Sequence, residues 1–195
     1  SESGSHILYY FRQENELVKD LFINAHEILT IDKRTGKSKI RNKKIKRYIF
    51  IDDFCGSGHQ VNEDYTKEII DELLKLNPKT EIFYYSLLAT KDGLKHIIKN
   101  TKFIPKCIFE LDDTFECFSP SSRYFYIKYR NIDKDFAEKF CRSYGSLVDA
   151  FNPLGYYNCQ LLLGFAHNVP DNTLPIIWGE NDKMTPIFKR YIKNL

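Results

Sequence analysis

The sequence predicts an α/β fold with a mainly parallel central sheet and helices on both of its faces. Three apolar runs rich in β-forming residues have the length of buried strands, at 48–51, 81–89 and 106–111. Helical patterns at 63–76 and 90–98 separate them. Strands that alternate with helices in this way are typical of a parallel sheet with right-handed crossovers.

Length and composition favour one globular domain over residues 1–195, with natural sequence missing upstream of Ser1 because the chain does not begin with Met. A net charge of +3 is too small to indicate nucleic acid by itself. The sequence shows neither a signal peptide nor an apolar run near the roughly 18 residues of a membrane span. Five cysteines without a C-x-x-C pair indicate reduced thiols rather than a disulfide framework or a zinc site. We therefore expect a cytoplasmic protein without membrane segments, whose oligomeric state stays open.

The first residues combine small side chains with a helical pattern. Ser3, Gly4 and Ser5 precede apolar residues that recur at helical spacing between Leu17 and Ala25. A serine before an amphipathic helix is a common N-cap.

A strongly basic hairpin is expected next. Residues 28–31 and a run that begins at Lys37 are strand-like arms, and residues 32–36 read as the turn between them. One interpretation is a solvated edge hairpin that its lysines protect from aggregation. The other is a surface or lid that faces an anion, either pyrophosphate or nucleic acid. Nine of the fifteen residues from 33 to 47 are basic: Lys33, Arg34, Lys37, Lys39, Arg41, Lys43, Lys44, Lys46 and Arg47.

Residues 48–60 carry the densest chemical signal in the chain. The expected strand is followed by two carboxylates, Asp52 and Asp53, and then by the loop Gly56-Ser57-Gly58. Loops at the carboxyl ends of parallel strands form the crevice where α/β sheets bind ligands. Amides at a helix start suit a phosphate, and the carboxylates suit sugar hydroxyls or hydrated Mg²⁺. The pattern predicts a ribose 5-phosphate site, against the alternative of an ordinary strand and turn with a solvated acidic pair.

The remainder of the chain predicts further elements. Asp112-Asp113 follows a strand without a glycine loop and is expected to form a turn. Residues 133–144 form an amphipathic helix that Asp133 caps. Strands are expected at 159–165 and, with fewer signals, at 123–129. Residues 166–175 read as a rigid polar loop, which either lines a pocket or packs as a structural loop.

Residues 48–60 resemble the signature of the type I phosphoribosyltransferases, which consists of four apolar residues, two acidic ones, two apolar ones and a small loop. The resemblance implies that Asp52 and Asp53 are catalytic and contact the ribose hydroxyls of phosphoribosyl pyrophosphate (PRPP). The ending Gly-Ser-Gly-His-Gln and residues 163–178 resemble a divergent bacterial branch associated with conflict and defence systems. The resemblance implies that the ribose 5-phosphate is bound by Cys55, Gly56, Ser57, Gly58, His59 and Gln60.

The same resemblance implies the rest of the site. Pyrophosphate would be held by an early loop and by the basic hairpin acting as a lid. Mg²⁺ would be the cofactor, carried by the ligand near Asp52 and Asp53 rather than bound directly by the protein. A nucleobase or nucleotide acceptor would meet His167 and Asn168. The residues implied for pyrophosphate are Ser3, Gly4, Ser5, Lys37, Lys39 and Arg41.

Two functions follow from this sequence. The first is Mg²⁺-assisted glycosyl transfer from PRPP, or from a related ribose 5-phosphate ligand, at the anomeric carbon. The second is a non-catalytic module that senses nucleotides or binds nucleic acid, as an effector or sensor in bacterial defence. His59 and Gln60 favour the second, because the family usually has a small residue and a Thr there. The acidic pair Glu63-Asp64 also favours it, since carboxylates near a helix start oppose a bound dianion.

Overall fold

The computed structural model describes residues 2–62, 64–125, 133–182 and 184–191. The sequence predicted a single domain, and the structure divides the chain into two compact units, Ser1–Glu110 and Leu111–Leu195. Each unit is described by itself. In the described ranges, no helix has both the length and the apolar character that a bilayer crossing requires.

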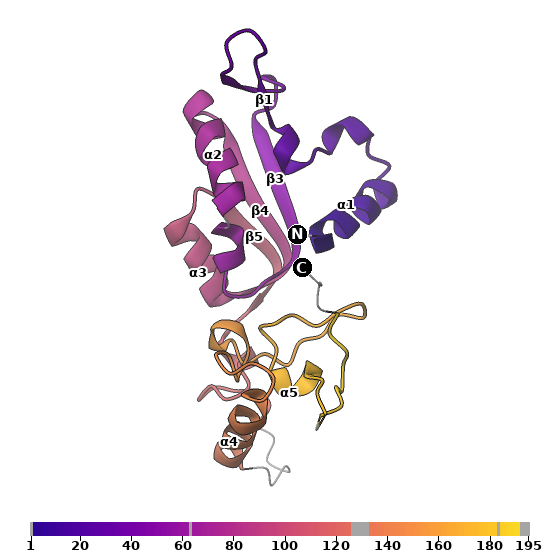
Figure 1. The fold of residues 1–195 in the computed structure, drawn as a ribbon, viewed down its shortest axis with the longest axis vertical. Coiled ribbons are helices and arrows are strands. Elements are labelled where there is room, and N and C mark those ends of the chain that lie inside the picture. Colours follow the sequence, from indigo (N-terminus) through magenta and orange to yellow (C-terminus); the bar gives the residue numbers. More distant parts are fainter. Residues whose placement is uncertain (1, 63, 126–132, 183, 192–195) are drawn as a thin grey trace. The chain divides into compact units, whose positions relative to one another are not determined.

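The first unit is built on a three-stranded parallel sheet, which confirms the predicted α/β class. Its strands are β3 (Arg47–Cys55), β4 (Glu81–Thr90) and β5 (Ile104–Leu111), in the order β3-β4-β5. The crossovers are α2 (Asp64–Leu76) and α3 (Lys91–Asn100). Figure 1 shows α2 and α3 on one side of the sheet and α1 (Glu2–Glu14) on the other.

The core of this unit lies between the sheet and α2. Ile69, Ile70 and Leu73 recur at helical spacing and are buried against Ile82 and Tyr84 of β4. Burial of this apolar face fixes α2 on the sheet, as its sequence pattern predicted.

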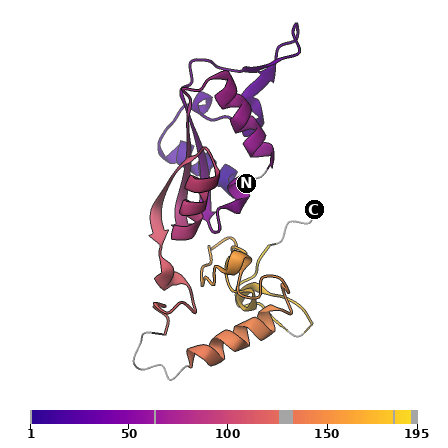
Figure 2. The same ribbon diagram turned by 90° about the vertical axis from the view of Figure 1, so that its left-hand side faces the viewer.

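The basic hairpin forms as predicted. β1 (Leu29–Ile31) pairs antiparallel with β2 (Ser38–Ile40). Gly36 closes the turn with a φ of 67°, a conformation that favours glycine. The hairpin projects beyond the sheet in both ribbon views (Figure 1 and Figure 2).

The prediction of a helix between Leu17 and Ala25 is wrong. The chain is helical earlier, in α1, and then forms two short 3₁₀ turns, η1 (Lys19–Leu21) and η2 (Ala25–Glu27). Val18 and Leu21 are 64% and 67% exposed, so their helical spacing has no apolar surface to pack against.

The second unit has little regular structure. It contains α4 (Lys134–Gly145), with Asp133 as its predicted N-cap, and α5 (Pro175–Trp178). Its described residues also form two short 3₁₀ turns, η4 (Asp113–Phe115) and η5 (Tyr156–Asn158). Asp112 caps η4, so the turn predicted at Asp112-Asp113 is confirmed.

The prediction of a strand at 159–165 is wrong. Only isolated bridges form there, from Leu161 to Thr173 and from Phe165 to Asn168. Gln160 has a φ of 54°, which an extended strand does not allow. The strand predicted at 123–129 lies mostly outside the described residues, and residues 123–125 are not in a strand.

Candidate functional site

The predicted acidic pair lies inside β3 rather than after it, because the strand continues to Cys55. Successive residues of a strand point to opposite faces of the sheet. Tyr48 and Phe50 face the core cluster that includes α2, so Asp52 faces the same side. Asp53 therefore faces the other side, on which α1 lies (Figure 1). The two carboxylates do not converge from one face of the sheet.

Asp52 is a buried carboxylate with an exposed fraction of only 7%. The Tyr84 hydroxyl donates a hydrogen bond to its Oδ2 atom at 3.1 Å, and the Asp53 amide donates to its Oδ1 atom, also at 3.1 Å. Burial first, and then the charge of Asp52, raises the pKa of Tyr84 well above its usual value. The phenol therefore keeps its proton and serves as the donor to Asp52.

The sequence patterns did not identify Tyr84 as a site residue, nor Ser86, which lies two positions further along β4. Ser86 pairs with Asp52 in the register of β3 and β4 and is 4% exposed. Among the described residues, the Ser86 hydroxyl has no hydrogen-bond partner. The alternation of β4 could have placed Tyr84 and Ser86 on one face, but only the strand register brings them to Asp52.

The glycine loop packs closely on the start of α3. The Thr90 hydroxyl donates to the carbonyl of Gly56 at 2.6 Å and accepts from the Gly93 amide at 2.9 Å. Gly58 has a φ of 76°, and a Cβ atom built on it would lie 2.6 Å from the Gly93 carbonyl oxygen. A Cβ atom on Gly93 would lie 2.1 Å from the Gly56 carbonyl oxygen. The glycines therefore permit close contact between the loop and α3.

The predicted phosphate-loop residues differ in accessibility. Cys55 is fully buried and pairs with Ala89 of β4, so its thiol belongs to the core. Ser57 is half-buried, and its Oγ atom accepts from the His59 amide at 3.4 Å. Ser57 is therefore the loop side chain of those two that solvent and a ligand can reach.

The loop ends in the short 3₁₀ turn η3 (His59–Asn62). Gln60 returns to β3, where its Nε2 atom donates to the carbonyl of Phe54 at 3.3 Å. The His59 ring lies on the His96 ring of α3 with 3.8 Å between the ring centroids. Burial lowers the pKa of His96, and the neighbouring His59 and Lys99 lower it further. His59 and Gln60 thus connect the loop to α3 and to the end of β3.

The basic hairpin is at the other end of the sheet. It leads into β3 at Arg47, whereas the glycine loop follows β3 at Cys55. At about 3.3 Å per residue, these two ends of the strand are about 26 Å apart. The hairpin predicted as a lid therefore does not cover the glycine loop in this structure.

Two of the three hairpin residues expected to bind pyrophosphate are held in ion pairs. Lys39 Nζ lies 3.2 Å from Asp32 Oδ2, and Arg41 Nη1 lies 2.8 Å from Glu27 Oε1. Lys37 forms no ion pair with a carboxylate in the described parts of the chain. These ion pairs neutralise two of the positive charges that the lid interpretation assigned to pyrophosphate.

The other predicted site residues fall elsewhere. Ser3, Gly4 and Ser5 have helical backbone within α1 and do not form a loop before a helix. His167 and Asn168 belong to the second unit, where residues 165–168 form a tight turn. His167 is exposed, and the Asn168 side chain accepts from the amides of Val169 and Tyr191. Their role toward an acceptor stays a prediction.

The site offers polar groups for a ligand but no ready-made metal centre. Within residues 2–62, 64–125, 133–182 and 184–191, no group of three or more His, Cys, Asp and Glu side chains is arranged to hold a metal ion.

The family model PRTase-CE matches residues 1–190, almost the whole chain. The chain belongs to this phosphoribosyltransferase-like family. The resemblance inferred from residues 48–60 is thereby confirmed at the level of the family. The PRTase-CE match spans both compact units, so the second unit is part of what defines the family.

Comparisons beyond the PRTase-CE family add little. No curated protein matches the chain. A solved structure of the AQ2163 protein from Aquifex aeolicus is similar to this chain at 19% identity, with a TM-score of 0.26. The match covers 43% of this chain and 40% of that one, and so low a TM-score carries no argument about the fold.

Proposed function

We propose that this PRTase-CE protein binds PRPP, or a related ribose 5-phosphate ligand, at the carboxyl end of β3 and transfers the phosphoribosyl group to a nitrogen acceptor. The observation that carries the proposal is the loop from Gly56 to Gly58, which lies against the start of α3 at the end of a parallel sheet. That end of the sheet is where α/β folds bind ligands. Membership of a phosphoribosyltransferase-like family supports the same ligand class.

The proposed roles follow from accessibility. Ser57 and the amides of the loop would receive the 5-phosphate, because the serine is only half-buried. Asp53, also half-buried, would accept hydrogen bonds from the ribose hydroxyls. Asp52 would act indirectly, since its contact with Tyr84 joins β3 to β4 below the loop.

The reaction has a clear electrostatic requirement. The bond from the anomeric carbon to pyrophosphate breaks, positive charge develops on the ribose ring, and a bond to the acceptor nitrogen forms. A carboxylate such as Asp53 would stabilise the ring charge, and a bound Mg²⁺ would supply positive charge for the leaving pyrophosphate. No covalent intermediate with the protein is needed.

The decisive experiment measures binding and turnover separately. Calorimetry with PRPP and Mg²⁺ should detect binding by the unmodified chain, and Asp53→Asn should weaken it by about tenfold or more. Release of pyrophosphate in the presence of nucleobases would establish transfer. Absence of PRPP binding by the unmodified chain would overturn the proposal.

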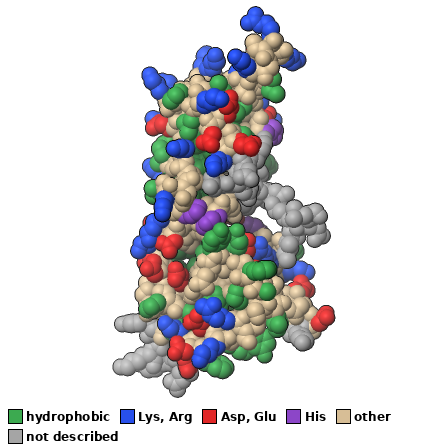
Figure 3. Space-filling view, turned by 60° about the vertical axis from the view of Figure 1, so that its left-hand side comes forward, with side chains coloured by type: hydrophobic (Ala, Val, Ile, Leu, Met, Phe, Trp, Pro, Cys, Tyr) green, Lys and Arg blue, Asp and Glu red, His purple; other side chains and the backbone are tan. Residues whose placement is uncertain are grey.

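The alternative is a non-catalytic module, and one observation favours it. Lys and Arg side chains gather at the end of the first unit that carries the hairpin (Figure 3), away from the glycine loop. Such a surface suits the phosphates of a nucleic acid. PRPP binding without pyrophosphate release, together with salt-dependent binding of DNA or RNA, would support this alternative, including a role as a sensor or effector in bacterial defence.

A further inference from the structure

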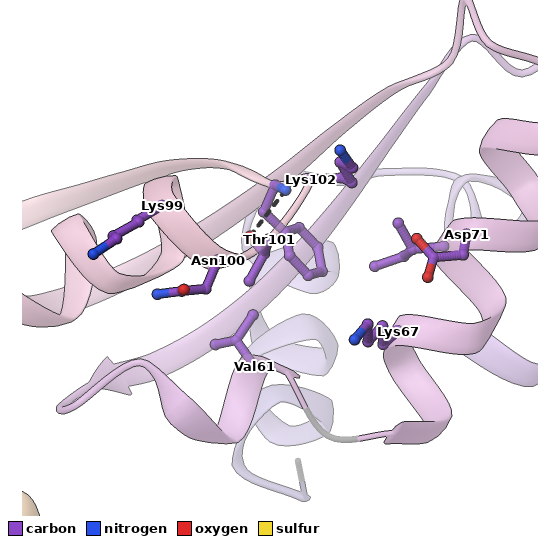
Figure 4. Close-up of a pocket in the computed structure, with 9 residues that line it drawn as sticks. Val61, Lys67, Asp71, Lys99, Asn100, Thr101 and Lys102 are labelled. Atoms are coloured by element: carbon purple, nitrogen blue, oxygen red, sulfur yellow. Dashed lines mark hydrogen bonds between the residues drawn. The ribbon is translucent and has the colours of Figure 1, made fainter.

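A cavity of about 160 Å³ lies in the first unit, and its lining shares no residue with the proposed PRPP site. Figure 4 shows residues of α2 on one side of it, the end of α3 on the other, and Val61 of η3 between them. The cavity is lined by Val61, Lys67, Ile70, Asp71, Lys99, Asn100, Thr101, Lys102 and Phe103.

The lining separates into an apolar floor and a charged rim. Val61, Ile70 and Phe103 are buried, with exposed fractions of 8%, 3% and 6%. The lysines of the lining are all exposed: Lys67, Lys99 and Lys102. A floor of this kind accepts an apolar ring, and lysines at an open rim accept an anion.

The rim has an excess of positive charge. In the described parts of the chain, none of the three lysines forms an ion pair, and Asp71 is the one carboxylate of the lining. The charge of Lys99 also contributes to the lowered pKa of His96. The balance of three ammonium groups against one carboxylate favours a ligand with negative charge.

Side chains satisfy two of the carbonyl groups near the end of α3. Carbonyl groups at a helix C-terminus carry partial negative charge. Here the Thr101 hydroxyl donates to the Ile97 carbonyl at 2.7 Å, and the Asn100 side chain donates to the His96 carbonyl at 2.9 Å. Thr101 also accepts from the Phe103 amide at 3.1 Å, which fixes the turn that carries Lys102 (Figure 4).

We propose that this cavity binds a nucleoside monophosphate, with its base on the floor of Val61, Ile70 and Phe103 and its phosphate among Lys67, Lys99 and Lys102. The volume fits one ring system, since sites for whole drug-sized ligands begin at about 300 Å³. The phosphate therefore stays at the open rim, where the flexible lysine stems reach it. In Figure 4 Lys67 lies on α2 at the edge of the cavity, on the side opposite the end of α3.

Methyl NMR of protein labelled at isoleucine and valine tests the site directly, because Val61 and Ile70 carry reporter methyl groups on the floor. AMP is the probe, and adenosine is the comparison that lacks the phosphate. AMP should shift both signals in a saturable way, and adenosine should bind more weakly. Raising the salt concentration should weaken AMP binding, because the lysines are exposed.

Variants separate this cavity from the proposed PRPP site. Lys67→Gln with Lys102→Gln should weaken AMP binding at the cavity about fivefold, because exposed charges contribute only modestly to binding. Lys75→Gln with Lys79→Gln makes the same change in net charge outside the lining and should leave binding unchanged. Ser57→Ala should also leave the Val61 and Ile70 shifts unchanged.

Two results would overturn the proposal. One is an AMP titration of the unmodified protein that leaves the Val61 and Ile70 signals unshifted. The other is loss of the AMP response in Ser57→Ala with full retention in the double lysine variant, which would assign the nucleotide to the glycine loop. Neither result depends on whether PRPP is bound or consumed.

Discussion

Tyr84 of β4 donates a hydrogen bond to the buried carboxylate of Asp52 on β3, across 3.1 Å. The contact lies on the core side of the sheet, three residues before β3 ends at Cys55. Through this hydrogen bond Asp52 stabilises the fold, whereas the sequence predicted that it contacts a ligand. Asp53 lies on the opposite face and is only partly buried.

Tyr84→Phe should lower the free energy of unfolding by roughly 1–3 kcal/mol, because it removes a donor to a buried carboxylate. Urea unfolding measures the change. Tyr85→Phe is the matched control, since Tyr85 is the next residue of β4 and faces the other side. An equal loss in both variants would show that the Tyr84 hydrogen bond has no special contribution.

The two carboxylates should respond differently to truncation. Asp52→Ala should destabilise the fold by roughly 1–3 kcal/mol, because it leaves the buried Tyr84 hydroxyl without this acceptor. Asp53→Ala should destabilise the fold less than Asp52→Ala, because Asp53 is only partly buried. Thermal and urea unfolding of both variants provide the comparison. A larger loss for Asp53 would contradict the assignment of the faces.

Gly93→Ala should destabilise the protein, although glycine to alanine inside a helix usually stabilises by about 1 kcal/mol. The reversal is expected because the new Cβ atom would meet the Gly56 carbonyl oxygen at 2.1 Å. Gly36→Ala is the control, since no atom lies within 4 Å of its Cβ position and only its positive φ opposes the change. Denaturant midpoints measure the stability of both variants. A Gly93→Ala variant as stable as the unmodified chain would contradict the close contact.

Glu27 should make stability depend on pH at the acid end. A hydrogen bond from Arg41, followed by those from Asn24, lowers the pKa of Glu27 from 4.5 to about 2. A lowered folded-state pKa stabilises the fold above pH 4.5, and this contribution disappears as the pH falls through 2. The unmodified chain should therefore be more stable than Glu27→Gln at pH 6 in low salt, and the difference should close near pH 2.

Arg41→Gln provides the control for that pH experiment. Loss of the guanidinium should raise the pKa of Glu27 toward its ordinary value, so the acid dependence should move to higher pH. A difference between Glu27→Gln and the unmodified chain that stays constant from pH 6 to pH 2 would exclude a linked titration.

Replacement of Lys37, Lys39 and Arg41 by Ala tests the hairpin. If the hairpin binds nucleic acid, the triple variant should bind DNA or RNA more weakly and with a flatter dependence on salt, because fewer counterions are released. PRPP affinity should not change, because the hairpin lies at the far end of β3 from the glycine loop. A loss of PRPP or pyrophosphate binding would instead support a lid that moves toward the loop.

The local sequence determined much of the first unit. Alternating strand and helix patterns gave the parallel α/β class, and the turn at Gly36 gave the hairpin, because both depend on residues close together in the chain. The motif at residues 48–60 indicated the family that the PRTase-CE match confirms. The predicted helix between Leu17 and Ala25 failed because helical spacing alone does not show whether a surface exists to bury it.

Only the tertiary structure decided what the motif residues do. Gly58 was expected to allow a ligand to approach the backbone closely. It has a positive φ, but the Gly93 carbonyl occupies the space beside it. Asp52 and Asp53 look equivalent in the sequence, and strand alternation together with the register of β4 buries one against Tyr84 and leaves the other half-exposed. The physical reason is that burial and hydrogen bonding depend on residues 30 to 40 positions away, which no local pattern names.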